Sequence, residues 1–274
     1  MNMVLEVIKS VILGVIQGVT EWLPISSTGH MILFNDLWPL NFSKAFTDLF
    51  LVVIQFGSIL AVIVLFFHKL NPFSPKKTTL QKRQTWSLWL KVLVASVPVA
   101  VIGLVFEEKI DALFYNAPTV AVALIVYGIA FLFIERPGRR PAIRDVEHIN
   151  GKTALLIGVF QVLALIPGTS RSGSTILAAV LLGCSRYAAA EFSFFLAIPA
   201  MLGASGLKIL KYGFHFSSEE LLVLAVGFVV AFLVSLVVVR FLMNFVKKHD
   251  FKVFGWYRIA LGLVVLLYFF VLRG

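Results

Sequence analysis

The residues that could do chemistry begin with two ionisable side chains in an apolar stretch near the start of the chain. Glu21 and His30 flank a run of hydroxyl residues there. A charged side chain at the centre of a membrane costs roughly 2.5–3.5 kcal/mol, so such residues are usually functional. Gln17 lies one helical turn before Glu21, so both side chains could ligate one cation or hold one substrate group. The alternatives are a structural role for Glu21 beside a buried arginine and a core role for His30.

A second polar run interrupts an apolar stretch in the other half of the chain. Residues 167–175 combine glycines and hydroxyl side chains with one arginine, Arg171. Glycines let the main chain approach a ligand closely, and N–H groups at a helix N-terminus bind anions. An arginine fork matches a phosphate group. Together these features predict a phosphate or pyrophosphate site; the alternative is a structural ion pair between Arg171 and Glu21.

The two runs together are typical of phosphoryl transfer, which depends mainly on positioning and on neutralisation of charge. Arg171 and the helix N-termini would supply positive potential, and a divalent metal near Glu21 would add to it. Ser27 and His30 are three apart, so they can face each other across one helical turn. His30 could deprotonate Ser27 or a water molecule, or attack phosphorus itself. All three nucleophiles remain open at this point.

The two motifs are long enough to carry a family resemblance. Residues 14–31 read GVIQGVTEWLPISSTGHM, and residues 167–176 read PGTSRSGSTI. With the stretch EFSFFLAIP at Glu191–Pro199, they closely resemble the bacterial undecaprenyl-diphosphate phosphatase family, also known as bacitracin-resistance proteins. The resemblance covers essentially the whole chain, including its length and its repeat layout.

The resemblance implies an activity and a site. The expected reaction is hydrolysis of undecaprenyl diphosphate to undecaprenyl phosphate and inorganic phosphate at the outer face of the bacterial plasma membrane, with Mg²⁺ or Ca²⁺ as cofactor. It would recycle the lipid carrier for peptidoglycan synthesis and confer resistance to bacitracin, which binds the diphosphate. The predicted catalytic residues are Glu21, Ser27, His30 and Arg171. The predicted phosphate-binding residues are Ser26, Thr28, Gly168, Ser170, Arg171, Ser172, Gly173 and Thr175.

One position qualifies the metal site. The family's motif has glutamate or glutamine four residues before a glutamate, and here Gln17 takes the amide form. A two-carboxylate metal site is therefore weakened. Glu21 becomes the main predicted metal ligand, with Gln17 as a second candidate.

Two other functions compete with the phosphatase, and a second family of lipid phosphatases must be excluded. A lipid-phosphate transporter or flippase would use the same broken helices at the membrane midplane, and it could coexist with hydrolysis. A structural protein with a buried Glu–Arg pair leaves the hydroxyl residues around Arg171 unexplained. The other large lipid phosphatase family needs a histidine after its Ser-Arg pair, where this chain has Ile176 and Leu177, so that assignment is excluded.

The composition indicates a membrane protein. The chain has 274 residues, of which 59% are hydrophobic and 14% charged, whereas soluble domains have about 25% charged residues. The formal charge of +10 does not indicate nucleic-acid binding, because the basic residues form short runs between apolar segments. Cys184 stands alone, which excludes an intramolecular disulfide and a cysteine-based metal site. The N-terminus, interrupted by Glu6 and Lys9, is expected to be mature protein and not a signal peptide.

Six segments are apolar and long enough to span a membrane. They are Ala45–Phe67, Leu88–Phe106, Thr119–Ile134, Glu191–Leu210, Glu220–Val239 and Tyr257–Leu272. Two further apolar segments, Leu5–Phe34 and Lys152–Leu182, are broken near the middle by proline, glycine and hydroxyl residues. Because a proline removes a helical N–H, each should form two half-helices, and such main chain is tolerated at membrane depth only inside protein or beside water. Both are predicted re-entrant hairpins.

The two hairpins also belong to an internal repeat. The spacing from Gly14 to Gly29 equals that from Gly158 to Gly173. Each half, about 1–140 and 150–274, is therefore predicted to contain one broken hairpin and three spans, within a single membrane domain of about ten helices. Because three is odd, the second half starts on the opposite side of the membrane. The hairpin tips should meet near the midplane.

The loops predict the orientation. Basic residues gather in the first, third and fifth connections, while the Glu107–Asp111 loop is acidic on balance. The basic residues are Lys69, Lys76, Lys77, Lys82, Arg83, Arg136, Arg139, Arg140, Arg144, Lys152, Arg240, Lys247, Lys248, Lys252 and Arg258. With these connections in the cytoplasm, both termini and the open site face outward. Glycine and alanine in the spans could serve either internal packing or the contact face of a homodimer.

Overall fold

The computed structural model describes residues 2–134, 140–213 and 215–272. Within these ranges the chain is helical and contains no β-strand. The helices are α1 (Met3–Thr20), α2 (Ser27–Leu37), α3 (Lys44–Leu65), α4 (Phe67–Leu70), α5 (Thr79–Phe114), α6 (Ala117–Ile134), η1 (Val146–His148), α7 (Gly151–Gln161), η2 (Val162–Leu165), α8 (Arg171–Leu181), α9 (Arg186–Tyr212), α10 (Ser218–Phe245), α11 (Lys252–Leu267) and η3 (Tyr268–Leu272).

Seven of the described helices are long and apolar enough to cross a membrane: α1, α3, α5, α6, α9, α10 and α11. This confirms the predicted all-α membrane fold, with one more candidate span than the six predicted. The additional helix is α1, the first arm of the first predicted hairpin. It runs for 18 residues before the chain breaks, so that arm alone reaches the length that a span needs.

The largest error in the predicted helix bounds concerns α5. The predicted span Leu88–Phe106 lies inside a helix of 36 residues, Thr79–Phe114. The predicted loop Glu107–Asp111 is wrong, because these residues continue the helix. Charged residues can end the membrane-buried part of a helix without breaking it, and no proline follows Pro98 before the helix ends. Arg136 and Arg139 of the next predicted loop lie outside the described residues.

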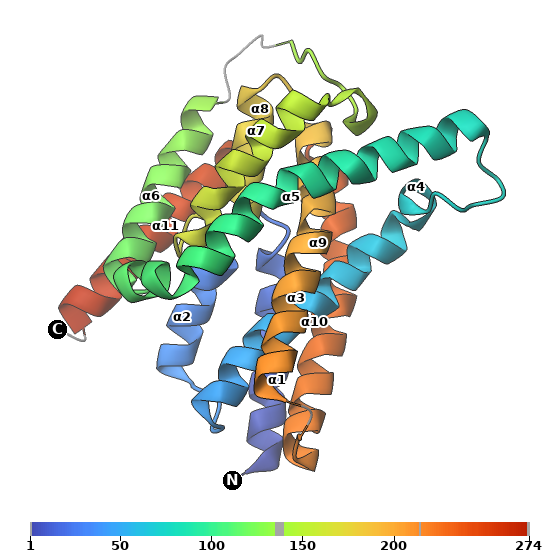
Figure 1. Cartoon of the computed structure of the whole chain (residues 1–274). Helices are drawn as coiled ribbons and strands as arrows, with labels where there is room; N and C mark the ends of the chain where they lie inside the picture. The colour runs from blue at the N-terminus through green and yellow to red at the C-terminus, as the bar shows by residue number, and fades with distance from the viewer. Residues whose placement is uncertain (1, 135–139, 214, 273–274) are drawn as a thin grey trace.

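Both predicted hairpins are present and share one local geometry. The breaks fall at Pro24 and Pro167, between α1 and α2 and between η2 and α8. Ser26 and Ser170 have left-handed φ angles of 72° and 70°, and each hydroxyl accepts the hydrogen bond from the N–H three residues later. In Figure 1, α1 and α2 enter from the lower end, whereas α7 and α8 enter from the upper end. The hairpins therefore approach each other from opposite ends.

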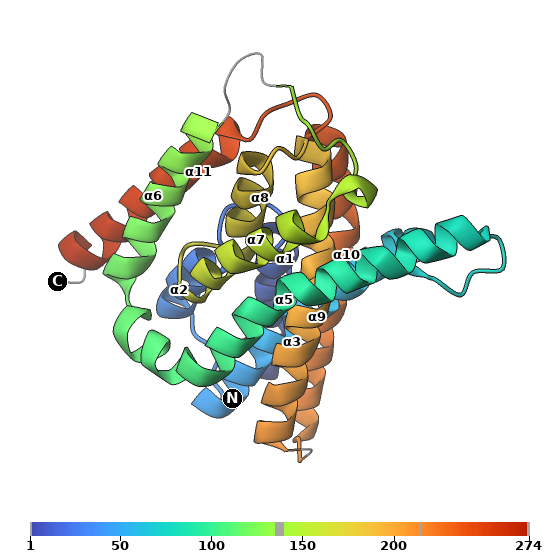
Figure 2. The same cartoon turned by 45° about the horizontal axis from the view of Figure 1, so that its top comes forward.

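The packing partners repeat as well. Helix α1 packs against α10, and its counterpart α7 packs against α5, the counterpart of α10. Figures 1 and 2 show α6 alongside α11. A Cβ on Gly14 would lie 2.7 Å from the carbonyl oxygen of Gly227, and one on Gly158 would collide with the main chain of Ala95. Equivalent glycines thus allow equivalent helix contacts. The repeat bounds near 140 and 150 stay a prediction.

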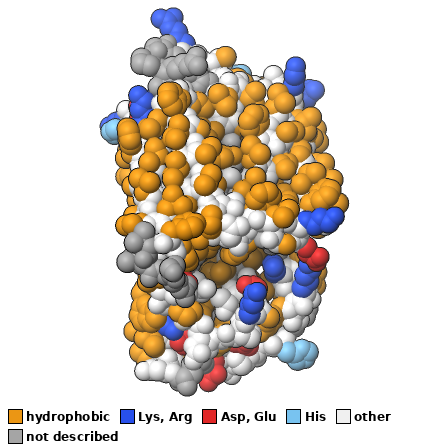
Figure 3. Space-filling model, turned by 90° about the vertical axis from the view of Figure 1, so that its left-hand side faces the viewer, with side chains coloured by type: hydrophobic (Ala, Val, Ile, Leu, Met, Phe, Trp, Pro, Cys, Tyr) orange, Lys and Arg blue, Asp and Glu red, His pale blue; other side chains and the backbone are white. Residues whose placement is uncertain are grey.

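The apolar core lies around α8 and α9, where Phe192, Phe194 and Phe195 are buried. Trp22 of the first tip packs edge-on against Phe194, with ring centroids 5.1 Å apart. Much apolar surface also remains exposed, including Val126 and Phe133. Figure 3 shows a broad apolar surface on one face. Such a surface is unfavourable in water and suits contact with lipid tails.

Candidate functional site

The two hairpin tips meet through a buried ion pair. The Arg171 guanidinium donates to Glu21 Oε1 at 2.8 Å, and its other amino group donates to the Ser193 carbonyl oxygen at 2.7 Å. The Glu21 side chain is 5% exposed and that of Arg171 13%. The predicted pairing of the two tips is confirmed. The Arg171 side chain keeps this small exposure, while its Nε atom is buried.

The Gln17 side chain bonds to the second carboxylate oxygen of Glu21, which leaves that oxygen less available to a metal ion. Its amide group donates to Glu21 Oε2 at 2.8 Å, so both carboxylate oxygens have partners. The described residues contain no group of three or more histidine, cysteine or carboxylate side chains that could hold a metal ion. Mg²⁺ and Ca²⁺ need several oxygen ligands. In this arrangement, Gln17 and Glu21 do not fit a cation site built by the protein alone.

At the starts of α2 and α8, the two cap serines bind the backbone of their own helices. Ser26 Oγ accepts from Gly29 N at 3.3 Å and Ser170 Oγ accepts from Gly173 N at 3.2 Å. Each hydroxyl thereby satisfies one of the free N–H groups at a helix start. The remaining N–H groups of α2 and α8 can contribute to an anion site.

The other hydroxyl residues of α8 lie inside the protein. The hydroxyls of Thr175 and Ser193 are 2.7 Å apart, and those of Ser172 and Ser170 are 3.1 Å apart. Ser172 and Thr175 are both buried, and the Thr175 hydroxyl contacts Ser193, whose carbonyl oxygen accepts from Arg171. The predicted residues with partly exposed surface are Ser27, Thr28, His30, Ser170 and Arg171.

His30 has both ring nitrogens engaged. Nδ1 lies 2.7 Å from the carbonyl oxygen of Ser26, and Nε2 lies 2.7 Å from the hydroxyl of Tyr257. A carbonyl oxygen only accepts, so Nδ1 carries the proton and Nε2 holds the lone pair. Ser27 and His30 lie one turn apart on α2, and the described contacts contain no hydrogen bond between them.

Arg258 is the main residue that the sequence interpretation misplaced. It was grouped with the basic residues of a cytoplasmic loop, yet it lies within α11 and is fully buried. Its guanidinium donates to the carbonyl oxygen of Pro24 at 3.1 Å, and to those of Gly168 and Thr169 at 2.8 and 3.0 Å. It therefore joins both tips. An ionisable residue followed by the apolar run Ile259–Leu267 was the signal that could have found it.

The charges of the site favour an anion. The two tips and Arg258 together bring two guanidinium groups against one carboxylate, Glu21. Arg258 is bonded to carbonyl oxygens and lies over the ring of Tyr127, at 5.4 Å from its centroid. Its positive charge is thus held by dipoles and an aromatic face. The net positive charge suits a phosphate ligand.

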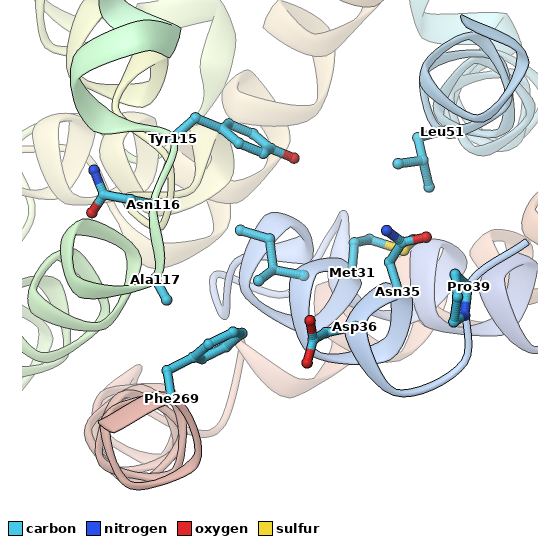
Figure 4. Close-up of a pocket in the computed structure, with 10 residues that line it drawn as sticks. Met31, Asn35, Asp36, Pro39, Leu51, Tyr115, Asn116, Ala117 and Phe269 are labelled. Carbon is cyan, nitrogen blue, oxygen red and sulfur yellow. The ribbon is translucent and has the colours of Figure 1, made fainter. Parts of the chain in front are cut away.

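A cavity of about 390 Å³ lies along α2, and its lining begins at Met31, the residue after His30. Figure 4 shows α2 on one side and the connection between α5 and α6 on the other, with Phe269 below. One part of the wall is polar and another apolar. It is lined by Met31, Ile32, Asn35, Asp36, Pro39, Leu51, Tyr115, Asn116, Ala117 and Phe269. The sequence offered no signal for this cavity, because its walls come from four separate parts of the chain.

A second charged cluster lies away from the tips. Lys69 of α4 contacts Glu191 at 2.9 Å and Glu147 at 3.0 Å. Burial lowers the pKa of Lys69, but the two carboxylates raise it above its usual value. Burial raises the pKa of Glu147, but the hydrogen bond from Lys69 brings it below its usual value. These ion pairs connect the first half of the chain to the second.

Comparison with known proteins gives a consistent picture. A family model described as "Bacitracin resistance protein BacA" matches residues 10–264. The chain is 63% identical over 268 residues to "Undecaprenyl-diphosphatase 1" of Clostridioides difficile, and the aligned region covers 98% of each chain. It is 56% identical to "Undecaprenyl-diphosphatase" of Acetivibrio thermocellus, over 98% of this chain and all of the relative. It is 57% identical to the protein of that name from Enterococcus faecalis, over 95% and 96% of the two chains.

Proposed function

Because this protein belongs to the bacitracin resistance protein family, we propose that it hydrolyses undecaprenyl diphosphate to undecaprenyl phosphate and inorganic phosphate in a bacterial membrane. Relatives named for this activity match nearly the whole chain at 56–63% identity. The observation that carries the proposal is the junction of the two tips, where Arg171, the first residue of α8, pairs with Glu21 of the other hairpin. The activity would remove the diphosphate that bacitracin binds and so give resistance.

The chemistry follows from the accessible groups. The substrate's terminal phosphate would lie against Arg171 and the N–H groups of α2 and α8, where charge developing on its oxygens is neutralised. An oxygen nucleophile forms the new P–O bond while the bridging P–O bond breaks and undecaprenyl phosphate leaves. Nε2 of His30 is the ring nitrogen able to take the nucleophile's proton. Ser27 and a water molecule are the two oxygen nucleophiles compatible with this arrangement. A serine nucleophile would need water to release the phosphate afterwards.

The cavity supports access from the outer side. It lies along α2, and Figure 1 shows α2 in the lower part of the molecule and α4 at the upper right. With the basic connections in the cytoplasm, the cavity opens outward and both termini also lie outside. The mixed wall would hold the junction between the diphosphate and the prenyl chain, and the tail would extend into the lipid.

The proposal also states how a divalent cation reaches the site. Glu21 already has a partner on each oxygen, so we propose that Mg²⁺ or Ca²⁺ arrives bound to the substrate's diphosphate. Mg²⁺ is commonly held by few carboxylates together with substrate phosphates. When present, it would neutralise phosphate charge. Isothermal titration of the protein with cation alone should then give no tight binding, whereas cation should still be needed for hydrolysis.

The test is phosphate release from undecaprenyl diphosphate by detergent-purified protein. Wild type should release phosphate with Mg²⁺ or Ca²⁺ and lose activity in excess chelator. Arg171→Ala and His30→Ala should each lose at least about 100-fold in rate. Arg240→Ala, an exposed arginine of α10, is the matched control and should keep wild-type activity. Wild-type rates in Arg171→Ala and His30→Ala would refute the assignment of the site.

A lipid flippase is the second candidate, and one observation favours it. The Lys69 ion pairs join α4 to Glu191 of α9 and to Glu147, across the two halves of the repeat. Repeats of opposite insertion that move against each other are typical of transporters, and these pairs would then close the cytoplasmic end. Lys69→Ala should speed exchange of labelled carrier lipid between vesicle leaflets. No lipid exchange by wild type or variant, in vesicles that still release phosphate from the substrate, would exclude flipping.

A homodimer stays a prediction, and sedimentation in detergent would test it.

A further inference from the structure

Helix α11 brings two adjacent polar residues to the tips, and neither belongs to the motifs that identify the family. Tyr257 meets His30, and Arg258 meets the main chain of both tips. The inference below concerns these two residues and rests on the proposed hydrolysis.

The contact of His30 with Tyr257 has a defined direction. Because the Ser26 carbonyl oxygen takes the proton of Nδ1, neutral His30 presents a lone pair at Nε2. The hydroxyl of Tyr257, 2.7 Å away, must then donate its proton to Nε2. If the imidazole becomes protonated, the same hydroxyl can accept from Nε2. One partner therefore fits both charge states through which a general base passes.

The two rings also fix the plane of the imidazole. They lie nearly parallel, with an interplanar angle of 8° and centroids 5.7 Å apart. Tyr257 is 44% exposed, so its hydroxyl sits at the rim of the site and can turn aside when a nucleophile arrives. The carbonyl of Ser26 and the hydroxyl of Tyr257 hold the imidazole from its two nitrogens.

Arg258 fixes the position of Tyr257 relative to the two tips. Its guanidinium is fully buried and donates to carbonyl oxygens on both hairpins. A Cβ on Gly173 would lie 3.2 Å from its Nη1, so α8 approaches the guanidinium closely. Because Tyr257 is the preceding residue on the same helical turn, these bonds fix its distance from His30.

We propose that Tyr257 is a positioning residue for the hydrolysis: its hydroxyl holds His30 with Nε2 as the basic nitrogen, and Arg258 anchors that tyrosine to the two tips. Tyr257 then acts through His30 and does not bind the substrate. Its loss should lower turnover more than substrate affinity. The proposal adds a third element, α11, to a site that the motifs place on the two hairpins.

The test is Tyr257→Phe, which keeps the stacked ring and removes the hydroxyl. We expect kcat to fall about tenfold, a part of what a general base contributes, with KM changed by less than about twofold. In ¹⁵N-histidine-labelled protein, with the His30 signal identified through His30→Ala, the Nε2 resonance should shift because its hydrogen bond is lost. Tyr212→Phe, which loses a hydroxyl bonded to Glu220, should change neither quantity.

Each other outcome would overturn the proposal. Wild-type kcat in Tyr257→Phe would show that the hydroxyl is not needed. A rise in KM alone would make Tyr257 a substrate contact. A lower kcat with an unchanged Nε2 resonance would show that it does not act through His30. If wild type released no phosphate at all, the proposed function would fail, while the resonance would still report on the contact with His30.

Discussion

The two hairpin tips have the same backbone but different side chains. Ser26 and Ser170 share an unusual φ and the same cap hydrogen bond, and they lie at equivalent places in the repeat. Where the first tip has Glu21 and His30, the second has Leu165 and Ser174; where the second has Arg171, the first has Ser27.

The difference teaches how a duplicated fold can divide one task. The two hairpins share this backbone and enter the protein from opposite ends (Figure 1). The first tip supplies the groups that can accept a proton, and the second supplies the cation that can hold a phosphate. Neither tip alone contains both, so a site forms only where they meet.

The largest effect should come from the second tip's cation. Arg171→Ala removes the guanidinium and leaves Glu21 buried without its ion-pair partner. We expect kcat/KM for phosphate release to fall by about 10²–10³. Arg171→Lys keeps the charge without the fork and should recover only part of this loss. Full recovery with lysine would show that charge alone matters.

The next effect compares equivalent positions of the two tips. His30→Ala should lower kcat about 100-fold, since it removes the predicted base. Ser174→Ala changes the equivalent residue of the second tip, whose hydroxyl bonds to Tyr127, and should leave kcat within about threefold of wild type. Equal losses at both positions would contradict the division of roles.

A smaller and symmetric effect is expected in stability. Ser26→Ala and Ser170→Ala each remove a helix cap while keeping the same backbone strain, so each should lower the free energy of unfolding by about 1 kcal/mol. Thermal unfolding in detergent would measure both. Clearly unequal losses would show that the two caps are not equivalent.

The smallest effect lies outside both tips. The pKa of Glu147 is below its usual value because of Lys69, so this pair stabilises the fold above pH about 4.3. That contribution should disappear as the pH falls through the folded-state pKa. Glu147→Gln should reduce the fall in melting temperature between pH 6 and pH 3 slightly, since the pair is partly exposed. An unchanged pH dependence would show that the pair adds no stability.

The sequence predicted the parts of the site that have local signals. Prolines and glycines marked both breaks, the repeat predicted that the tips meet, and the charged residues Glu21 and Arg171 stood out within apolar segments. It missed Arg258 because a basic residue near the start of a helix looks like a loop residue under the positive-inside rule. It missed Tyr257 because nothing in the sequence shows that this side chain reaches His30. The length of α5 was missed because charges do not end a helix.

Other features depend on tertiary contacts that have no sequence signature. The burial of Ser172 and Thr175 follows from how α8 packs. The cavity forms where α2 meets three distant elements. Periodicity and composition describe single segments, so they cannot report which segments enclose a space.

The central claim is that the two tips form one hydrolytic site, and a double-mutant cycle tests it most directly. The rate of phosphate release from undecaprenyl diphosphate is measured for wild type, Glu21→Gln, Arg171→Gln and the double variant. If the pair acts as a unit, each single change lowers kcat strongly and the double variant is within about threefold of Arg171→Gln. Losses that multiply in the double variant, or near wild-type rates in either single variant, would contradict the account.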